Sequence, residues 1–177
     1  MYKLTDIYRQ IKEEEAALPK QQYKIYCDMD GVLCDFDKQF KQYAKMDPKT
    51  FESKLGTDKF WELIDGIGYM FWSKMPWMQD GKQLWSYISK YKPTLLSAPS
   101  QKASSRYGKR LWVNENTPGT KLVLAKRENK QEYSGKNKIL IDDLQNTIDE
   151  WNSRGGIGIL HTSTTNTIEK LKELGYE

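Results

Sequence analysis

The chain has 177 residues, enough for one domain of ordinary size with room for a small inserted subdomain. A hydrophobic content of 38% with 29% charged residues is typical of a soluble globular protein, and no run reaches the roughly 18 apolar residues that span a bilayer. The net charge of +4 favours anionic ligands slightly but falls short of a dedicated nucleic-acid binder. Residues 1–20 lack the apolar core of a signal peptide, so we expect a cytoplasmic protein with no membrane partner.

The hydrophobic pattern alternates between helices and short strands. Apolar residues at helical spacing from Leu4 predict a helix that ends before Pro19. The brief apolar segment "QYKIYCDMD" predicts a buried strand that ends at Gly31. Further strands are predicted in "PTLLSAPS", "TKLVLA", "KNKILIDD" and "IGILH". Helices are predicted in "GKQLWSYISKYK", "KASSRYGKRLWVNEN", "LQNTIDEWNSRGG" and "TNTIEKLKELG".

Strands that alternate with helices of about ten residues predict an α/β fold. We expect right-handed crossovers and a three-layer, Rossmann-like parallel sheet. Residues 33–78 are rich in aromatics and hold no convincing strand, so they predict a small helical cap inserted after the first strand. The α/β core would then consist of residues 1–32 and 79–177.

Four carboxylates lie where predicted strands end: Asp28 and Asp30 after the first, and Asp142 and Asp143 after "KILI". In parallel sheets ligands bind at the carboxyl ends of the strands, so these side chains are expected to converge. Carboxylates gathered at one point are tolerated when a divalent cation neutralises them, and hard oxygen ligands suit Mg²⁺ best. We therefore expect a magnesium site formed by all four, with Gly31 allowing the chain to turn sharply beside it.

A carboxylate held against Mg²⁺ can attack phosphorus, because the metal screens the repulsion between two anions. Asp28 is the expected nucleophile, and Asp30, two residues on, is the expected general acid and base. A calcium loop of the EF-hand type is excluded, because its twelfth position must be glutamate and here it is Gln39. Asp143 has an alternative role as a helix N-cap, which is compatible with binding a metal.

The spacing of these motifs resembles that of the haloacid-dehalogenase (HAD) superfamily. "DMDGVLCDFD" resembles its first motif, DxDGxxxDx, and follows a strand as that family requires. "LLSAP" resembles the second motif, which implies that Ser97 hydrogen-bonds the transferred phosphoryl group. "KNKILIDDLQNTIDEW" resembles the fourth, in which an acidic pair ends a strand, and this implies that Asp143 or Asp142 completes the magnesium sphere.

Within the superfamily the sequence is most similar to the 5'(3')-deoxyribonucleotidases and their phage and bacterial relatives. Their pattern DMDGVLADF, TSP, KYxWV and LLIDD reads here "DMDGVLCDF", "SAP", "KRLWV" and "ILIDD". The resemblance implies that Lys130 is the third-motif lysine, with Lys126 as the open alternative, and that Lys109 is a second phosphate contact. One departure is Ala98, which replaces the second hydroxyl of TSP.

The cap is the segment expected to select the substrate. By the same resemblance Phe36 and either Phe71 or Trp72 belong to an aromatic pocket for the base, and Trp61 is a further candidate. Stacking on a base is worth about 1 to 3 kcal/mol. The alternative is that these aromatics form the core of the cap.

The sequence thus predicts a magnesium-dependent phosphomonoesterase that acts through an aspartyl-phosphate. The expected partner is a small-molecule phosphate ester, and the resemblance implies a deoxyribonucleoside monophosphate. One alternative is a 3'-phosphatase on nucleic-acid ends, the only reading with a nucleic-acid partner, and another is a non-catalytic module that binds nucleotides or phosphate. Cys27 and Cys34 lack metal-site spacing and are expected to be reduced thiols.

Overall fold

The computed structural model describes residue 5 and residues 23–177, so the helix expected between Leu4 and Pro19 lies outside the described residues except at Thr5. The described part contains one sheet of five parallel strands in the order β3-β2-β1-β4-β5. The strands are β1 (Lys24–Cys27), β2 (Thr94–Ser97), β3 (Lys121–Leu124), β4 (Lys138–Asp142) and β5 (Ile157–Leu160). The predicted α/β fold with a parallel sheet is confirmed. In residues 23–177 no helix is both long and apolar enough to cross a membrane.

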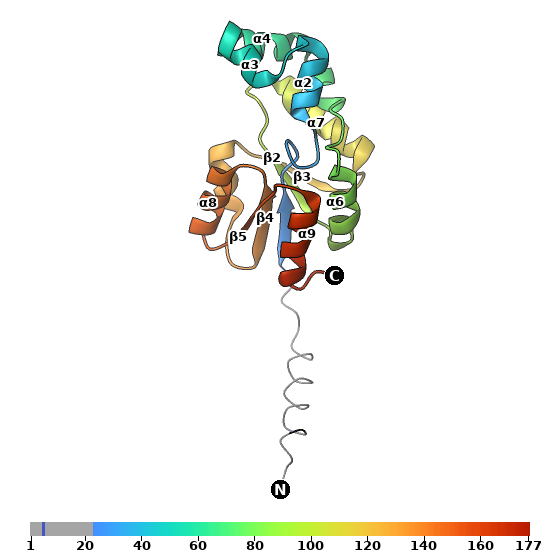
Figure 1. The fold of residues 1–177 in the computed structure, drawn as a ribbon, viewed down its shortest axis with the longest axis vertical. Coiled ribbons are helices and arrows are strands. Elements are labelled where there is room, and N and C mark those ends of the chain that lie inside the picture. Colours follow the sequence, from blue (N-terminus) through green and yellow to red (C-terminus); the bar gives the residue numbers. More distant parts are fainter. Residues whose placement is uncertain (1–4, 6–22) are drawn as a thin grey trace.

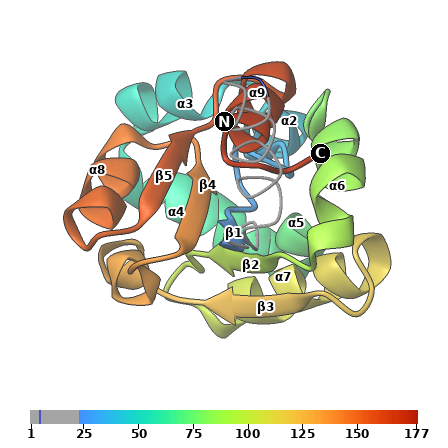
Figure 2. The same cartoon turned by 90° about the horizontal axis from the view of Figure 1, so that it is seen from below.

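Helices cover both faces of the sheet, which gives three layers. Figure 2 shows α6 (Gly81–Ile88) and α9 (Thr164–Glu173) on one side and α8 (Gln145–Ser153) on the other. Alternation along β1 explains this arrangement, because Ile25 and Cys27 belong to the core cluster that includes residues of α6 and α9, whereas Tyr26 packs with residues of α8. The remaining elements of the core are η1 (Ser89–Tyr91), α7 (Ala103–Asn116) and η2 (Arg127–Tyr133).

The segment between β1 and α6 forms helices above the carboxyl ends of the strands (Figure 1). They are α2 (Phe36–Ala44), α3 (Pro48–Leu55), α4 (Thr57–Ile67) and α5 (Tyr69–Ser73). The side chains of Asp35 and Asp47 cap α2 and α3, because each accepts a hydrogen bond from the backbone N–H three residues on, at 2.8 Å. Within the predicted cap segment the four helices lie between residues 36 and 73, and its two ends meet in an isolated bridge between Cys34 and Trp77.

The cap and the sheet share one continuous core. Phe40, Phe60 and Ile64 of the cap belong to the same cluster of buried residues as Ile25 of β1. Helix α7 approaches α5 so closely that a Cβ atom on Gly108 would lie 2.5 Å from the carbonyl oxygen of Tyr69. The cap is thus packed against the sheet through this shared core, and against α7 through α5.

Both cysteines are buried next to the site. Cys27 ends β1 and Cys34 follows the turn after it, and each is an unpaired thiol with no exposed surface. Burial raises the pKa of both thiols, with the charges of nearby aspartates adding to the effect. Free thiols at both positions match the expectation from the sequence.

Candidate active site

The site forms where the order of the strands reverses. Strand β1 lies between β2 and β4, and Cys27 pairs in register with Ile141. Just beyond this pair, the backbone N–H of Asp28 donates to the carbonyl oxygen of Ile141 at 2.9 Å. The next residues of both strands are therefore neighbours at the sheet's carboxyl edge, the place where open α/β sheets bind ligands.

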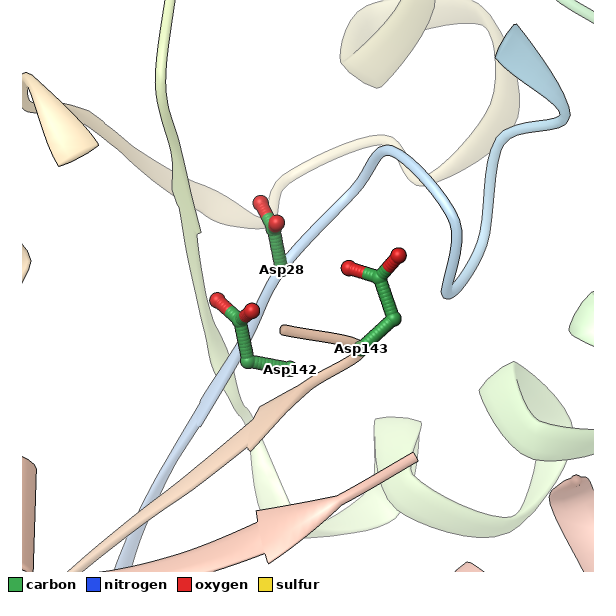
Figure 3. Close-up of side chains that lie close together, drawn as sticks. All are labelled: Asp28, Asp142 and Asp143. Carbon is green, nitrogen blue, oxygen red and sulfur yellow. The ribbon is translucent and has the colours of Figure 1, made fainter. Parts of the chain in front are cut away.

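Three carboxylates meet at this edge (Figure 3). Asp28, Asp142 and Asp143 each offer an oxygen atom, and these atoms lie within 4.8 Å of one another. Desolvation raises the pKa of Asp143 to about 7, and the negative charges of Asp28 and Asp142 add to the rise. Asp28 and Asp142 thus destabilise the ionised form of Asp143 in the absence of a cation.

Gly31 makes room for this cluster. Its backbone is left-handed, with φ of +75°, and a Cβ atom there would lie 2.3 Å from Oδ2 of Asp143. Glycine is the residue that adopts this conformation without strain and leaves this space free. The turn that the sequence placed at Gly31 therefore shapes the site as well as redirecting the chain.

Lys130 neutralises part of the charge. Its Nζ lies 2.8 Å from Oδ2 of Asp28 and 2.8 Å from Oδ2 of Asp142. Burial alone would lower the pKa of Lys130, but the two carboxylates outweigh it and hold the pKa above its usual value. The structure thus brings Lys130 into the site, whereas the alternative, Lys126, is exposed at the edge of the cavity.

These residues fit a magnesium ion. If all are ionised, three carboxylates and one ammonium group leave a formal charge of −2, which a divalent cation would neutralise. The donors are all carboxylate oxygens, as Mg²⁺ prefers. Asp28, Asp142 and Asp143 are therefore the residues that would hold the ion. Asp30, expected as a fourth ligand, does not join this group among the described residues.

Asp30 points to a second lysine instead. Lys109 Nζ donates to Oδ2 of Asp30 at 2.7 Å and to Oγ of Ser97 at 3.0 Å. Burial raises the pKa of Asp30, and the charge of Lys109 limits the rise. The other oxygen of Asp30, Oδ1, is buried and has no hydrogen-bond partner among the described residues. One oxygen of this carboxyl group is thus held by Lys109, and the other is buried without a partner among the described residues.

Ser97 and Lys109 were expected to contact phosphate directly. Both are fully buried, and neither is among the residues that line the cavity above the strand ends. In this structure Lys109 contacts both Ser97 and Asp30, so it positions the acid and base candidate. Their direct contact with phosphate remains a prediction.

A cavity of about 1160 Å³ lies between the cap and the strand ends. Asp28, Asp30, Lys130 and Asp143 line it from the core, and three of the expected aromatics, Phe36, Trp61 and Trp72, line it from the cap.

Phe71 does not line the cavity. Its side chain is fully buried, and its ring packs against Phe36 and Trp72 with centroid distances of 5.2 Å to both. Because it points into the core, Phe71 supports the aromatic wall from behind. Phe71 therefore belongs to the core of the cap, which was the alternative role expected for these aromatic residues.

Comparisons with known proteins address the fold. No family model and no curated protein matches the sequence. A hydrolase from Streptococcus pneumoniae TIGR4 matches in structure with a TM-score of 0.53 and 16% identity, covering 85% of this chain and 99% of its own. A HAD-superfamily hydrolase from Ehrlichia chaffeensis matches with a TM-score of 0.52 and 10% identity, covering 86% and 98%. The chain has a HAD-like fold. At these identities the likeness shows the fold alone.

Sequence reasoning missed three basic residues around the cavity, Lys102, Arg106 and Arg127, whereas Lys126 was already an alternative for the third-motif lysine. Nζ of Lys102 lies 4.0 Å from Oδ2 of Asp65 in the cap. In the sequence the three missed residues resemble ordinary surface charges of a helix or loop. The available signal was their position, since they lie in the segments that directly follow β2 and β3.

Proposed function

We propose that this chain is a magnesium-dependent phosphomonoesterase that works through an aspartyl-phosphate on Asp28. One observation carries the proposal: the Asp28 carboxylate ends β1 at the floor of the cavity, beside Asp142 and Asp143, with Lys130 at 2.8 Å. The description of both structural neighbours as hydrolases supports the reaction class.

Asp28, Asp142 and Asp143 would hold the Mg²⁺ ion, which when bound would screen the charges of the attacking carboxylate and the phosphoryl group. Lys130 supplies a second positive charge at the same place. The backbone N–H of Met29 donates to Oδ1 of Asp28 at 2.8 Å, so the nucleophile is held at both oxygens.

In the first step an oxygen of Asp28 attacks phosphorus. The bond from phosphorus to the leaving oxygen breaks, its electron pair goes to that oxygen, and Asp30 gives the oxygen a proton. In the second step Asp30 takes a proton from water as the water attacks phosphorus, and the bond to Asp28 breaks to release phosphate. The raised pKa of Asp30 suits the first role, because burial favours the protonated form of the carboxyl group.

The proposed substrate is a deoxyribonucleoside monophosphate. The cavity supports this choice, because Phe36, Trp61 and Trp72 form an apolar wall opposite the carboxylates. A base stacked on such a wall gains about 1 to 3 kcal/mol, which simple phosphate esters would lack. The cap would also keep water from the phosphoenzyme.

The decisive experiment measures phosphate release with and without Mg²⁺ from 5'- and 3'-deoxynucleotides, ribonucleotides and a 3'-phosphorylated oligonucleotide. Asp28→Asn is the blank, and Asp149→Asn, on the exposed side of α8, is the control. We expect deoxymononucleotides to be hydrolysed fastest, with activity lost only in the Asp28 variant.

Each alternative from the sequence has its own outcome in this assay. Faster hydrolysis of the oligonucleotide would establish a nucleic-acid 3'-phosphatase and refute the mononucleotide as substrate. Nucleotide binding without phosphate release, equal in the wild type and Asp28→Asn, would refute catalysis in favour of a binding module.

A further inference from the structure

Three cations line the cavity from the segments that follow β2 and β3, and we call Arg106, Lys126 and Arg127 the basic rim. Lys126 and Arg127 follow β3, and Arg106 lies in the first turns of α7, which follows β2. Ser97 at the end of β2 pairs with Leu124 at the end of β3, and the N–H of Ala125 donates to the carbonyl oxygen of Ser97 at 3.1 Å. The two segments therefore leave the sheet side by side.

The basic rim has no carboxylate partner in the described part of the chain. Among the residues that the structure describes, Lys130 and Lys109 are ion-paired with the aspartates of the site, and Lys102 with Asp65. No such pair involves the basic rim within residues 23–177. Nη1 of Arg106 lies 3.5 Å from the carbonyl oxygen of Ser100 and 3.4 Å from that of Gln101, which directs the guanidinium along the loop after β2. Three unpaired cations that share one cavity repel one another, so an anion among them relieves that repulsion.

The cap contributes the reverse charge to the cavity. Asp35, Asp37 and Asp65 line it, together with the aromatic wall. An anionic group is disfavoured next to these carboxylates, whereas a base with its N–H groups is not. Charge thus makes the cap residues better suited to a base and the basic rim better suited to an anion.

The cavity is also larger than a mononucleotide needs. Small-ligand sites usually enclose about 300 to 1,000 Å³, and this one encloses about 1160 Å³. We propose that the basic rim is a subsite for a second phosphate group of the substrate, so that one phosphate lies at Asp28 and the other at Arg106, Lys126 and Arg127. This inference rests on the proposed function and refines its substrate. A nucleoside bisphosphate and the phosphorylated end of an oligonucleotide share this chemistry.

Binding to the Asp28→Asn protein tests the subsite independently of turnover. Calorimetry compares thymidine 5'-monophosphate, thymidine 3',5'-bisphosphate and a tetranucleotide with a terminal phosphate. We expect the bisphosphate to bind about ten-fold more tightly than the monophosphate, and this ratio to fall to about one in the added double variant R106Q/R127Q. Arg110→Gln is the matched control, because Arg110 is an exposed cation of the same helix that does not line the cavity. It should keep the ratio.

Replacing Glu128 should have the opposite effect on this affinity ratio to replacing Arg106 and Arg127. It lines the cavity next to Arg127, so Glu128→Gln should increase the preference for the bisphosphate. Tighter binding of the tetranucleotide than of the bisphosphate would identify a nucleic-acid end as the source of the second phosphate. Tighter binding of the bisphosphate would identify the free nucleotide, and either result supports the subsite.

Two results would overturn the inference. One is equal affinity of the Asp28→Asn protein for monophosphate and bisphosphate. The other is an equal fall of the ratio in Arg110→Gln and in the double variant, which would assign the effect to overall charge. Phosphate release by the wild type decides the proposed function separately, since binding by the inactive protein requires no catalysis. Thermal unfolding of each variant shows that it is folded.

Discussion

Replacing Gly31 by alanine would perturb the acidic cluster without removing any charged group. The new methyl group would stand 2.3 Å from Oδ2 of Asp143, and ordinary van der Waals contact begins at 3.4 Å, so the carboxylate would have to move by about 1 Å. If Asp143 holds Mg²⁺ together with Asp28 and Asp142, this displacement should weaken metal binding.

In Gly31→Ala the free-energy cost of the left-handed backbone can be separated from the cost of displacing the Asp143 carboxylate. A left-handed conformation costs a non-glycine residue about 1 to 2 kcal/mol, and the lower entropy of the unfolded alanine chain offsets about 0.4 to 1 kcal/mol of it. Gly119→Ala bears the same cost, because Gly119 has φ of +79° and nothing within 4 Å of the new Cβ atom. The difference between the two variants therefore reports the contact with Asp143.

The assay is thermal unfolding across a titration with Mg²⁺, which needs no substrate. Disturbing the groups that orient a metal ligand costs about ten-fold or more in metal affinity. A ten-fold loss removes about 1.4 kcal/mol of stabilisation at saturating metal, or about 3 to 6 °C. We expect this deficit in Gly31→Ala and not in Gly119→Ala. Equal responses of the two variants to Mg²⁺ would refute the placement of the metal at Asp143.

Three further predictions concern other parts of the molecule. Lys130→Gln leaves two buried carboxylates without their cation, so urea unfolding should show a loss of about 3 to 5 kcal/mol, against about 0.5 kcal/mol or less for the exposed Lys126→Gln. Trp61→Ala should lower the preference for a nucleotide over p-nitrophenyl phosphate, measured as the ratio of kcat/KM values, by about 5- to 150-fold. Burial raises the pKa of Tyr176 to about 12 from 10, so its contribution to stability is complete below pH 10 and is lost as the pH rises toward 12. In Tyr176→Phe the urea midpoint should therefore fall less steeply between pH 9 and 12, while the exposed Tyr43→Phe should follow the wild type.

Each of these predictions has a result that contradicts it. Equal stability of the Lys130 and Lys126 variants would mean that the buried ion pairs add nothing. An unchanged preference in Trp61→Ala would place the base elsewhere in the cavity. An alkaline curve in Tyr176→Phe that matches the wild type would mean that other groups cause the loss of stability at high pH.

The sequence by itself determined the elements and the edge of the sheet at which the chemistry lies. Apolar runs of four or five residues, each ended by a glycine, a hydroxyl or a carboxylate, are local signals, and they located β1, β2 and β4, although β1 ends at Cys27 and not at the predicted Gly31. Because the carboxyl ends of parallel strands lie at one edge of the sheet, the sequence alone predicts that Asp28, Asp142 and Asp143 meet there.

Only the tertiary structure decided how the charged residues divide within that edge. Asp30 was expected beside the metal, yet it faces Lys109 of α7 at 2.7 Å. Lys126 and Lys130 could not be distinguished by spacing, but η2 exposes the first and buries the second between two aspartates.

The same holds for the walls of the cavity. Phe71 and Trp72 are adjacent in sequence, yet only Trp72 lines the cavity, and the basic rim is formed by segments that follow two different strands. The direction in which a side chain points, and the charge that it meets there, depend on how α5, α7 and η2 pack against elements distant in the sequence. That packing is a property of the whole fold, so the pattern of residues along the chain cannot specify it.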